Sequence, residues 1–521
     1  MEEQGIKRLL YNKRIWIYLC VMLVYVGGSV AFAKFTNLLN CGYFFADDHE
    51  IVRMNYTVDG QGLLYSLGAW MGADIHIRFR PLYWFIRVME SFGIGNNIFL
   101  WHTFKAMEIG LMGFLLYLFA RLMRCNPIVA VAFSIVPILG EQCAVVFRLG
   151  PQEPLATICL TLCLIACIAY QKCRRRWIGV SLCLLTTCMA CAKEAFTLLV
   201  PFVILFLFYL ELKEQETVGL QEIKACFVKF AGVLMYAIAL SIFCVGFIVF
   251  FTGTGSTGYA GFDGQSGAGF YVQQMLAICN SSLKPYLILF AGFFLLYLVS
   301  WLIGGKFAQN KKDMLLRLAE LLMPLYFIAT QLLLHAKSGM MERYLIPCIL
   351  GIYLYAFILG ERKLEAFKIG KVVWTVVVVA MTIYFAIASN IVQMCKDYAA
   401  DCVNNMVLLD RINVACQATE GQDTKVIVCT NYGERNLAIS AFQQELYGNS
   451  HVYSLSHTPE EVDYCVDRYV TEESVDGDLF ITDASVYMDQ GGLLTMRMIE
   501  NGMDPAIFQQ IQVGYYLIYY R

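Results

Sequence analysis

The stretch IWIYLCVMLVYVGGSVAFAK, residues 15–34, contains one charged side chain, and the acidic run FFADDHE, residues 44–50, follows it closely. An apolar run of about 20 residues is long enough for an α-helix to cross the hydrocarbon core of a bilayer. Carboxylates beside such a helix are costly unless they are hydrated, paired or used in a reaction. The stretch therefore predicts a membrane helix, with a candidate functional site at Asp47 and Asp48 directly beyond it.

The composition of the whole chain also predicts a membrane protein. Of the 521 residues, 59% are hydrophobic and only 15% are charged, and the mean hydropathy is +0.58. These values lie outside the range of soluble globular domains, so the chain is expected to cross the membrane several times. The net charge of −2 and the scattered basic clusters provide no positive stripe for a phosphate backbone, which excludes a nucleic-acid partner.

Roughly eleven apolar stretches are long enough to be membrane helices. Lysine and arginine prefer cytoplasmic connections, and the basic residues before the first stretch place the N-terminus inside. If every stretch spans, the basic connections alternate without a break, so the long first connection, about 35–97, is expected outside. The stretches fall near residues 15–34, 98–120, 127–147, 154–171, 177–192, 196–212, 230–252, 285–305, 318–335, 344–360 and 372–393.

The last part of the chain, residues 396–521, is more polar and changes its periodicity. Alternation of strands and helices favours a small α/β domain on a mainly parallel sheet, on the extracytoplasmic side. The chain is therefore expected to consist of a transmembrane domain, 1–395, and this α/β domain. Short apolar runs predict strands at 426–429, 452–455, 479–482 and 515–519, and helices are expected at 436–446, 459–469 and 492–501.

The first outer connection contains arginines as well as acids. Arg78 and Arg80 precede an aromatic run, and the planar fork of arginine binds phosphate oxygens in a bidentate manner. Acids and arginines on one outer loop suggest a phosphorylated, lipid-linked substrate with a carboxylate aimed at the reacting partner. The alternative is a hydrated loop with interfacial anchors.

Charged residues also begin later apolar stretches at their predicted outer ends. Glu153 precedes the fourth stretch, where a helix macrodipole alone would favour an acid. Lys193 and Glu194 form an almost loop-free turn, either as a self-satisfied ion pair or as a site in which the lysine binds phosphate. Arg343 and Tyr344 begin the tenth stretch, where interfacial anchoring is the alternative to a substrate contact.

A metal ion has weaker support from the sequence. The histidines show no metal-ligand spacing such as HExxH. Asp47 and Asp48 could provide oxygen ligands for a divalent cation, Mg²⁺ or Mn²⁺, although no feature of the sequence requires one.

The order and predicted sidedness of these motifs resemble the GT-C superfamily. These are multi-spanning glycosyltransferases that use polyprenyl-phosphate-linked sugars, such as the protein O-mannosyltransferases and the bacterial aminoarabinose transferases. The resemblance covers roughly residues 1–395 and leaves the C-terminal domain unassigned. It rests on the acidic pair after the first span, Arg-Pro-Leu at 80–82, Arg…Glu-Pro at 148–154, Lys-Glu at 193–194 and Arg-Tyr…Pro at 343–347.

The resemblance implies an enzyme that moves a sugar to an acceptor hydroxyl on the extracytoplasmic side, with inversion. It implies that Asp47 or Asp48 is the catalytic base, and that Glu153 orients the acceptor or shares the network of the base. The implied partners are a polyprenyl-phosphate-linked sugar, a glycan, lipid or protein acceptor, and the bilayer of a bacterial plasma membrane. The residues expected to bind the phosphate and lipid head are Arg78, Arg80, Lys193, Glu194, Arg343 and Tyr344.

Two other functions could use the same features. A transporter or flippase for lipid-linked saccharides usually has internal repeats and charges at mid-membrane, whereas the charges here cluster at the predicted outer ends. An O-antigen-type polymerase or ligase should have its large outer loop late in the chain, whereas this chain has its long loop first. Both differences favour the transferase.

Overall fold

The structure is a computed structural model. It describes residues 13–75, 78–140, 142–248, 250, 266–303, 311–340, 342–360, 368–418, 424–428, 430, 433–454, 477–483, 499–500, 502 and 504–521. The expected helix at 459–469 lies outside these residues, as does the one expected at 492–501 except for residues 499 and 500.

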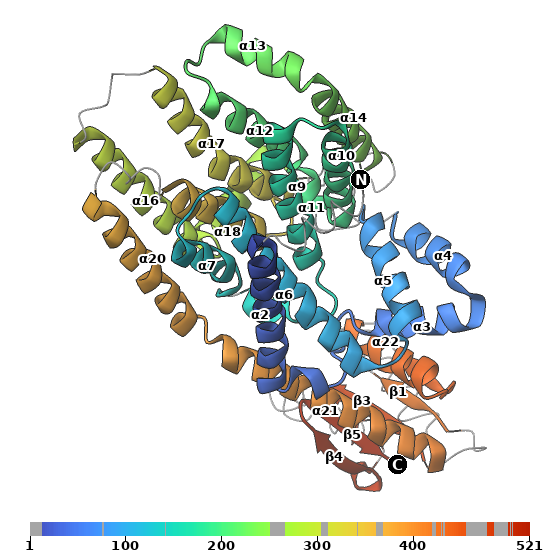
Figure 1. The fold of residues 1–521 in the computed structure, drawn as a ribbon. Helices are drawn as coiled ribbons and strands as arrows, with labels where there is room; N and C mark the ends of the chain where they lie inside the picture. Colours follow the sequence, from blue (N-terminus) through green and yellow to red (C-terminus); the bar gives the residue numbers. More distant parts are fainter. Residues whose placement is uncertain are drawn as a thin grey trace.

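Long apolar helices dominate the described part of the chain (Figure 1). Seven of its helical segments are long and apolar enough to cross a membrane, and up to nine if each of two bent helix pairs is one span. The α-helical, multi-pass membrane fold is thus confirmed, whereas the count of eleven spans is not. The segments include α2 (Lys13–Phe35), α6 (Ile98–Leu122), α9 (Glu153–Cys173), α12 (Val200–Glu214), α17 (Lys311–Leu334), α18 (Ile346–Tyr353) with its π-helical continuation Leu354–Leu359, and α20 (Lys368–Ala388).

The remaining apolar stretches form bent pairs or shorter helices. Two pairs bend by about a right angle, at 75° and 74°, over breaks of at most four residues. Pro137 interrupts the stretch at 127–147, because proline removes a backbone donor and restricts φ. That stretch therefore contains a short 3-10 turn, Val136–Ile138, after its helix instead of one long span. The bent pairs are α13 (Leu220–Lys229) with α14 (Ala231–Phe247) and α15 (Ala268–Asn280) with α16 (Lys284–Ile303), and the shorter helices are α7 (Pro127–Ile135), α8 (Cys143–Val146) and α10 (Arg176–Ala192).

Close contact between α2 and α6 depends on a glycine. A Cβ added at Gly110 of α6 would lie 2.6 Å from the Cα of Val26 in α2. Small residues let membrane helices approach to backbone contact, where van der Waals packing replaces the hydrophobic driving force. Nearer the start of α6, His102 Nε2 lies 2.9 Å from the Gly42 carbonyl, on the segment that leads to Asp47.

The first connection folds into three helices beside the bundle (Figure 1). They are α3 (His49–Gln61), α4 (Leu63–Ile75) and α5 (Pro81–Ile94). Trp84 of α5 stacks on Trp70 of α4 at 5.1 Å between ring centroids, within a small cluster of its own. The connection therefore has its own packed interior and can hold the side chains at its ends in place.

The C-terminal part contains α21 (Ile391–Ala418), α22 (Gly433–Ala441) with its π-helical continuation Phe442–Leu446, and a five-stranded sheet in the order β2-β1-β3-β5-β4. β1 pairs in parallel with β2 and β3, whereas β5 pairs antiparallel with β3 and β4. The four expected strands are present, but the sheet is mixed rather than mainly parallel. The two-residue connection between β4 and β5 is too short for a parallel crossover. The strands are β1 (Val426–Val428), β2 (Val452–Ser454), β3 (Leu479–Asp483), β4 (Gln509–Val513) and β5 (Tyr516–Tyr520).

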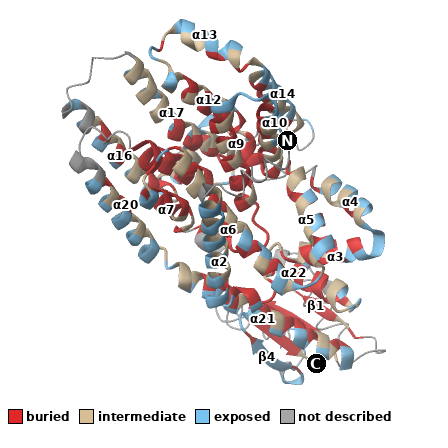
Figure 2. Ribbon diagram, viewed as in Figure 1, coloured by how far each residue is buried: buried red, intermediate tan, exposed pale blue. Residues whose placement is uncertain are grey.

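The sheet shares its core with the first connection. Phe45 packs against Phe442 and Tyr516, in both cases with 5.8 Å between ring centroids. Figure 2 shows buried residues both inside the helical bundle and along the sheet. The turn at 44–48 thus lies between the bundle and the α/β part, and both determine its position.

Candidate functional site

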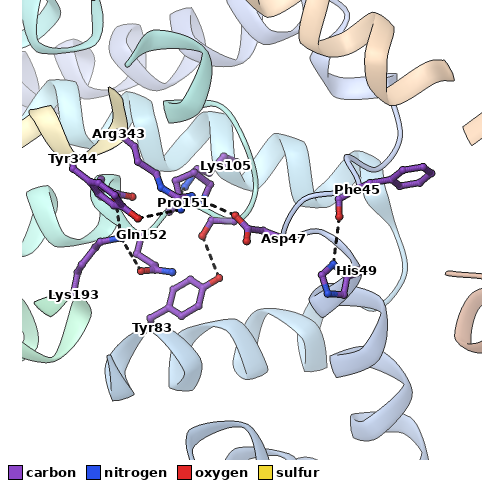
Figure 3. A network of polar contacts seen from close by, with 12 residues as sticks. Phe45, Asp47, His49, Tyr83, Lys105, Pro151, Gln152, Lys193, Arg343 and Tyr344 are labelled. Atoms are coloured by element: carbon purple, nitrogen blue, oxygen red, sulfur yellow. Dashed lines mark hydrogen bonds and ion pairs between the residues drawn. The ribbon is translucent and has the colours of Figure 1, made fainter. Parts of the chain in front are cut away.

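Side chains from four distant segments meet at one place, and Figure 3 shows three of them, Asp47, Lys193 and Arg343. Asp47 comes from the turn before α3, and Glu153 begins α9. Lys193 lies between α10 and the short helix α11 (Glu194–Thr197), and Arg343 lies in the 3-10 turn Glu342–Leu345 before α18. The four residues come from positions that the sequence analysis singled out, and the fold brings them together.

Asp47 and Arg343 form the open part of this site. Arg343 Nη1 lies 3.4 Å from Asp47 Oδ2, and the side chains are 23% and 40% exposed, respectively. Arg343 Nη2 donates a hydrogen bond to the Tyr344 hydroxyl at 3.2 Å, and the guanidinium lies 5.2 Å from the centroid of that ring. The carboxylate and the guanidinium are therefore ordered and still accessible to a substrate.

Asp47 has an unusual backbone conformation. Its φ is +70°, in the left-handed region that few residues other than glycine adopt. Gly150 lies directly against it, because a Cβ at that glycine would fall 2.4 Å from the Asp47 Cβ. The Tyr83 hydroxyl donates to the Gly150 carbonyl at 3.2 Å and so fixes the neighbouring loop to α5. Backbone strain of this kind often accompanies functional sites, and here it directs the carboxylate toward Arg343.

Lys193 and Glu153 form the buried part of the site. Lys193 Nζ lies 2.8 Å from Glu153 Oε1, and both side chains are only 2% exposed. The ammonium also donates to Gln152 Oε1 at 3.4 Å and lies 4.9 Å from the Tyr344 ring centroid. The ring of His335 stacks on Tyr344 at 4.6 Å. Tyr344 thus separates the buried pair from Arg343 while contacting both cations.

Replacing Lys193 by Met is expected to lower the free energy of unfolding by about 3–5 kcal/mol, because Glu153 would become a buried charge without its partner. The double variant Lys193→Met/Glu153→Gln should recover much of the loss, because no charge then remains buried. Unfolding in detergent micelles measures both. A single variant as stable as the double variant would contradict the role of the pair.

Asp48 lies in a different environment from Asp47. Its side chain is buried, and its Oδ2 accepts a hydrogen bond from the Phe44 backbone N–H at 2.8 Å. Burial raises the pKa of the Asp48 carboxyl from its ordinary 3.8 to about 7, although the Phe44 amide lowers it. The two adjacent acids therefore differ in exposure and in hydrogen-bond partners, a difference that the sequence could not reveal.

The raised pKa of Asp48 predicts a dependence of stability on pH. The folded chain binds this proton more tightly than the unfolded chain, so the stabilisation is complete below about pH 4 and is lost as the pH rises through about 7. Within this window, unfolding free energy should fall by up to about 1.4 kcal/mol per pH unit. Asp48→Asn should flatten this slope in melting temperatures taken from pH 5 to pH 8. An identical slope in the variant would show that another group titrates.

Arg80 has a carboxylate partner within the chain. Its Nε and Nη2 donate to the two oxygens of Asp74 at 2.8 and 2.9 Å, and both side chains are 9% exposed. The guanidinium also lies 5.0 and 5.1 Å from the ring centroids of Tyr83 and Trp84. The Arg80–Asp74 ion pair therefore joins the end of α4 to the start of α5.

The remaining predicted residues are Arg78 and Glu194. Arg78 is half-buried, and its backbone N–H donates to the Asp74 carbonyl at 2.7 Å. Glu194 is buried at the start of α11, directly after Lys193. Within the described ranges, no three His, Cys, Asp or Glu side chains lie close enough to hold one metal ion. A divalent cation at Asp47 and Asp48 stays an expectation from the sequence.

Two further residues belong to the site and were not predicted. Gln152 accepts from Lys193, and Glu50 lies on the first turn of α3, near Arg80 and Asp47. Burial raises the pKa of Glu50 to about 7. Its position in the same acidic run as Asp47 was an available signal.

Two solved structures are similar to this chain over nearly its whole length. Both are of ArnT from Cupriavidus metallidurans, one bound to undecaprenyl phosphate and one in the apo state. The bound structure is 10% identical, covers 98% of each chain and has a TM-score of 0.44. The apo structure is 11% identical, covers 97% of each chain and has a TM-score of 0.45. No protein-family model matches the chain, and no curated protein matches it.

At this identity and TM-score, the similarity does not assign the chain to a family.

Proposed function

We propose that this chain is a glycosyltransferase of the membrane. It transfers a sugar from a polyprenyl-phosphate donor to an acceptor hydroxyl on the outer side, with inversion. The observation that carries this proposal is the accessible Asp47 carboxylate, which contacts Arg343 beside a buried Lys193–Glu153 pair, at the ends of apolar helices. A general base and a phosphate-binding cation are the two groups that such a transfer requires.

Asp47 is the better base of the two adjacent acids. A base must lie within hydrogen-bond reach of the proton that it accepts. Asp47 is 40% exposed, whereas Asp48 is buried and accepts from the Phe44 amide. Arg343 lies 3.4 Å from Asp47, so a carboxylate and a cation stand side by side in the exposed part of the site.

The reaction is a single displacement. The acceptor oxygen attacks the anomeric carbon, the bond from that carbon to the phosphate oxygen breaks, and polyprenyl phosphate leaves with the electron pair. The hydroxyl proton passes to Asp47. Attack from the side opposite the leaving phosphate inverts the anomeric centre.

Arg343 is the proposed contact for the leaving phosphate. Its side chain is partly exposed, and its planar fork can bind two phosphate oxygens. Lys193 is buried and engaged by Glu153 and Gln152, so it positions Tyr344 and Arg343 from behind and adds positive potential. Arg80 is bound to Asp74 and stabilises the first connection, which carries Asp47.

A lipid-linked donor agrees with the surroundings of the site. An isoprenoid tail can enter between membrane helices while its head group reaches Asp47 and Arg343. The transfer then needs no nucleotide-sugar fold. The C-terminal α/β domain would lie on the same outer side, because its sheet packs on the turn that precedes Asp47.

The direct test uses purified protein in lipid nanodiscs with polyprenyl-phosphate sugars, one hexose or pentose donor at a time. The expected result is release of polyprenyl phosphate, detected by mass spectrometry, together with an acceptor of inverted anomeric configuration. Donor that crosses the membrane of a proteoliposome uncleaved would instead identify a flippase and overturn the proposal. Absence of cleavage with every donor would overturn it as well.

A further inference from the structure

A cavity borders the turn that contains Asp47. Its volume is about 180 Å³, and its lining residues come from this turn and from the C-terminal domain. The proposed reaction uses none of these lining residues. We call this cavity the seam cavity, and its lining includes Phe44, Ala46, Asp401, Asn405, Arg435 and Tyr515.

The polar lining of the seam cavity offers both donors and acceptors. Asp401 provides a carboxylate, Arg435 a guanidinium and Asn405 an amide that donates to the Tyr43 carbonyl at 3.3 Å. A sugar hydroxyl is at once a donor and an acceptor, so it needs such a mixed set. The charges of Asp401 and Arg435 balance, which favours a neutral polyol over an anionic phosphate or carboxylate.

The aromatic lining offers a flat apolar surface beside these polar groups. Tyr515 is 59% exposed and forms the two-residue turn between β4 and β5 together with Gly514. Gly514 has a φ of +55°, and a Cβ there would lie 3.1 Å from the Asn404 side chain, so glycine lets the turn rest against α21. Tyrosine combines an apolar ring with a polar hydroxyl and can pack against the C–H face of a sugar.

The opposite aromatic wall is ordered by its neighbours. The Phe44 ring lies 5.0 Å from the Tyr398 ring and 4.7 Å from the Arg148 guanidinium, measured to ring centroids. The Phe44 side chain, which borders the seam cavity, is therefore held in a defined orientation. Because this wall is already ordered, little conformational entropy is lost there when a ligand binds.

The volume limits the size of the ligand. Drug-sized molecules usually occupy cavities of about 300–1,000 Å³. The seam cavity, at about 180 Å³, lies below this range. This space suits one sugar ring, whereas a lipid tail or a folded peptide segment would need more.

We propose that the seam cavity binds one ring of a neutral saccharide, and that this saccharide is the acceptor of the transfer. The acceptor role of this saccharide rests on the proposed function. Ala46 lines the cavity and Asp47 follows it in the chain, so a glycan bound at the seam has its next ring within reach of the catalytic turn. The C-terminal domain thus selects the acceptor, while the helical bundle binds the donor.

The test measures binding alone, with the full chain in nanodiscs and no donor. Saturation-transfer NMR uses the methyl glycosides of glucose, galactose, mannose and N-acetylglucosamine as probes. At least one glycoside is expected to receive saturation from the wild type. Tyr515→Ala and Asp401→Asn should each reduce that transfer several-fold.

Ile511→Ala is the matched control, because Ile511 lies on β4 of the same hairpin, is exposed and does not line the seam cavity. It should retain the wild-type transfer. No transfer to any glycoside, or equal transfer in the wild type and Tyr515→Ala, would overturn the proposal. Transfer to a peptide containing serine and threonine, but to none of the glycosides, would also overturn it.

The outcome can be separated from that of the proposed reaction. Because no donor is present, saturation transfer does not depend on catalysis. If no glycoside receives saturation, the proposal of the saccharide site is wrong, and the proposed reaction is still tested by the donor-cleavage assay. If the wild-type chain binds a glycoside but cleaves no polyprenyl-phosphate sugar, the proposed reaction and the acceptor role are wrong. The saccharide site is then still supported.

Discussion

Asp47→Asn is expected to abolish sugar transfer while the protein stays folded in the membrane. A general base contributes about 10²–10⁴-fold to a rate, and the neutral amide cannot accept the hydroxyl proton. Asn is among the few residues that tolerate a left-handed backbone, so the turn at φ +70° should survive the substitution. The loss should therefore come from chemistry and not from a displaced loop. Release of polyprenyl phosphate under saturating donor measures it.

Asp48→Asn is the matched control for this experiment. Its amide oxygen can still accept from the Phe44 N–H, and the side chain is buried away from substrate. Turnover by this variant should stay close to the wild type. Full turnover by Asp47→Asn, or a loss of turnover confined to Asp48→Asn, would show that Asp47 is not the base.

Arg343→Met should lower kcat by about 10²–10³-fold, the usual cost of removing one donor that stabilises a developing negative charge. Arg343 is the cation that contacts Asp47, so its loss removes the proposed phosphate contact and alters the charge beside the base. Arg343→Lys should recover part of the rate. A lysine restores the charge but lacks the planar fork that binds two oxygens. The readouts are kcat and the KM for the polyprenyl-phosphate donor.

Lys396→Met provides a control with the same change in net charge. Lys396 is exposed on α21, where its ammonium lies 5.1 Å from the Phe35 ring centroid and outside the contacts of the site. Its kinetic constants should match those of the wild type. If Arg343→Met retained the wild-type kcat and donor KM, the phosphate contact would have to lie elsewhere.

The membrane fold could be predicted because its signals are local. The length of an apolar stretch and its lack of charge decide whether a helix can cross a bilayer, and both are properties of consecutive residues. The number of spans was harder to predict. Pro137 interrupts one stretch, and two further stretches bend sharply before Ala231 and Lys284.

The C-terminal sheet also could be predicted only in part. Strands such as β3 and β5 are apolar enough to be predicted, but β4, with the sequence QQIQV, is polar and largely exposed. Its existence depends on pairing with β5. Strand direction also depended on the connections, since one short turn converts part of a parallel sheet into an antiparallel hairpin.

The sequence by itself determined the membrane class and the residue types of the candidate site. It also predicted that Asp47, Glu153, Lys193 and Arg343 belong to one side of the protein. The tertiary structure decided their pairing: Lys193 with Glu153, Arg343 with Asp47, and Arg80 with Asp74. It alone distinguished Asp47 from Asp48. The length of an apolar stretch is a property of consecutive residues. Burial, backbone conformation and the pairing of charged side chains arise only when segments far apart in the chain pack together.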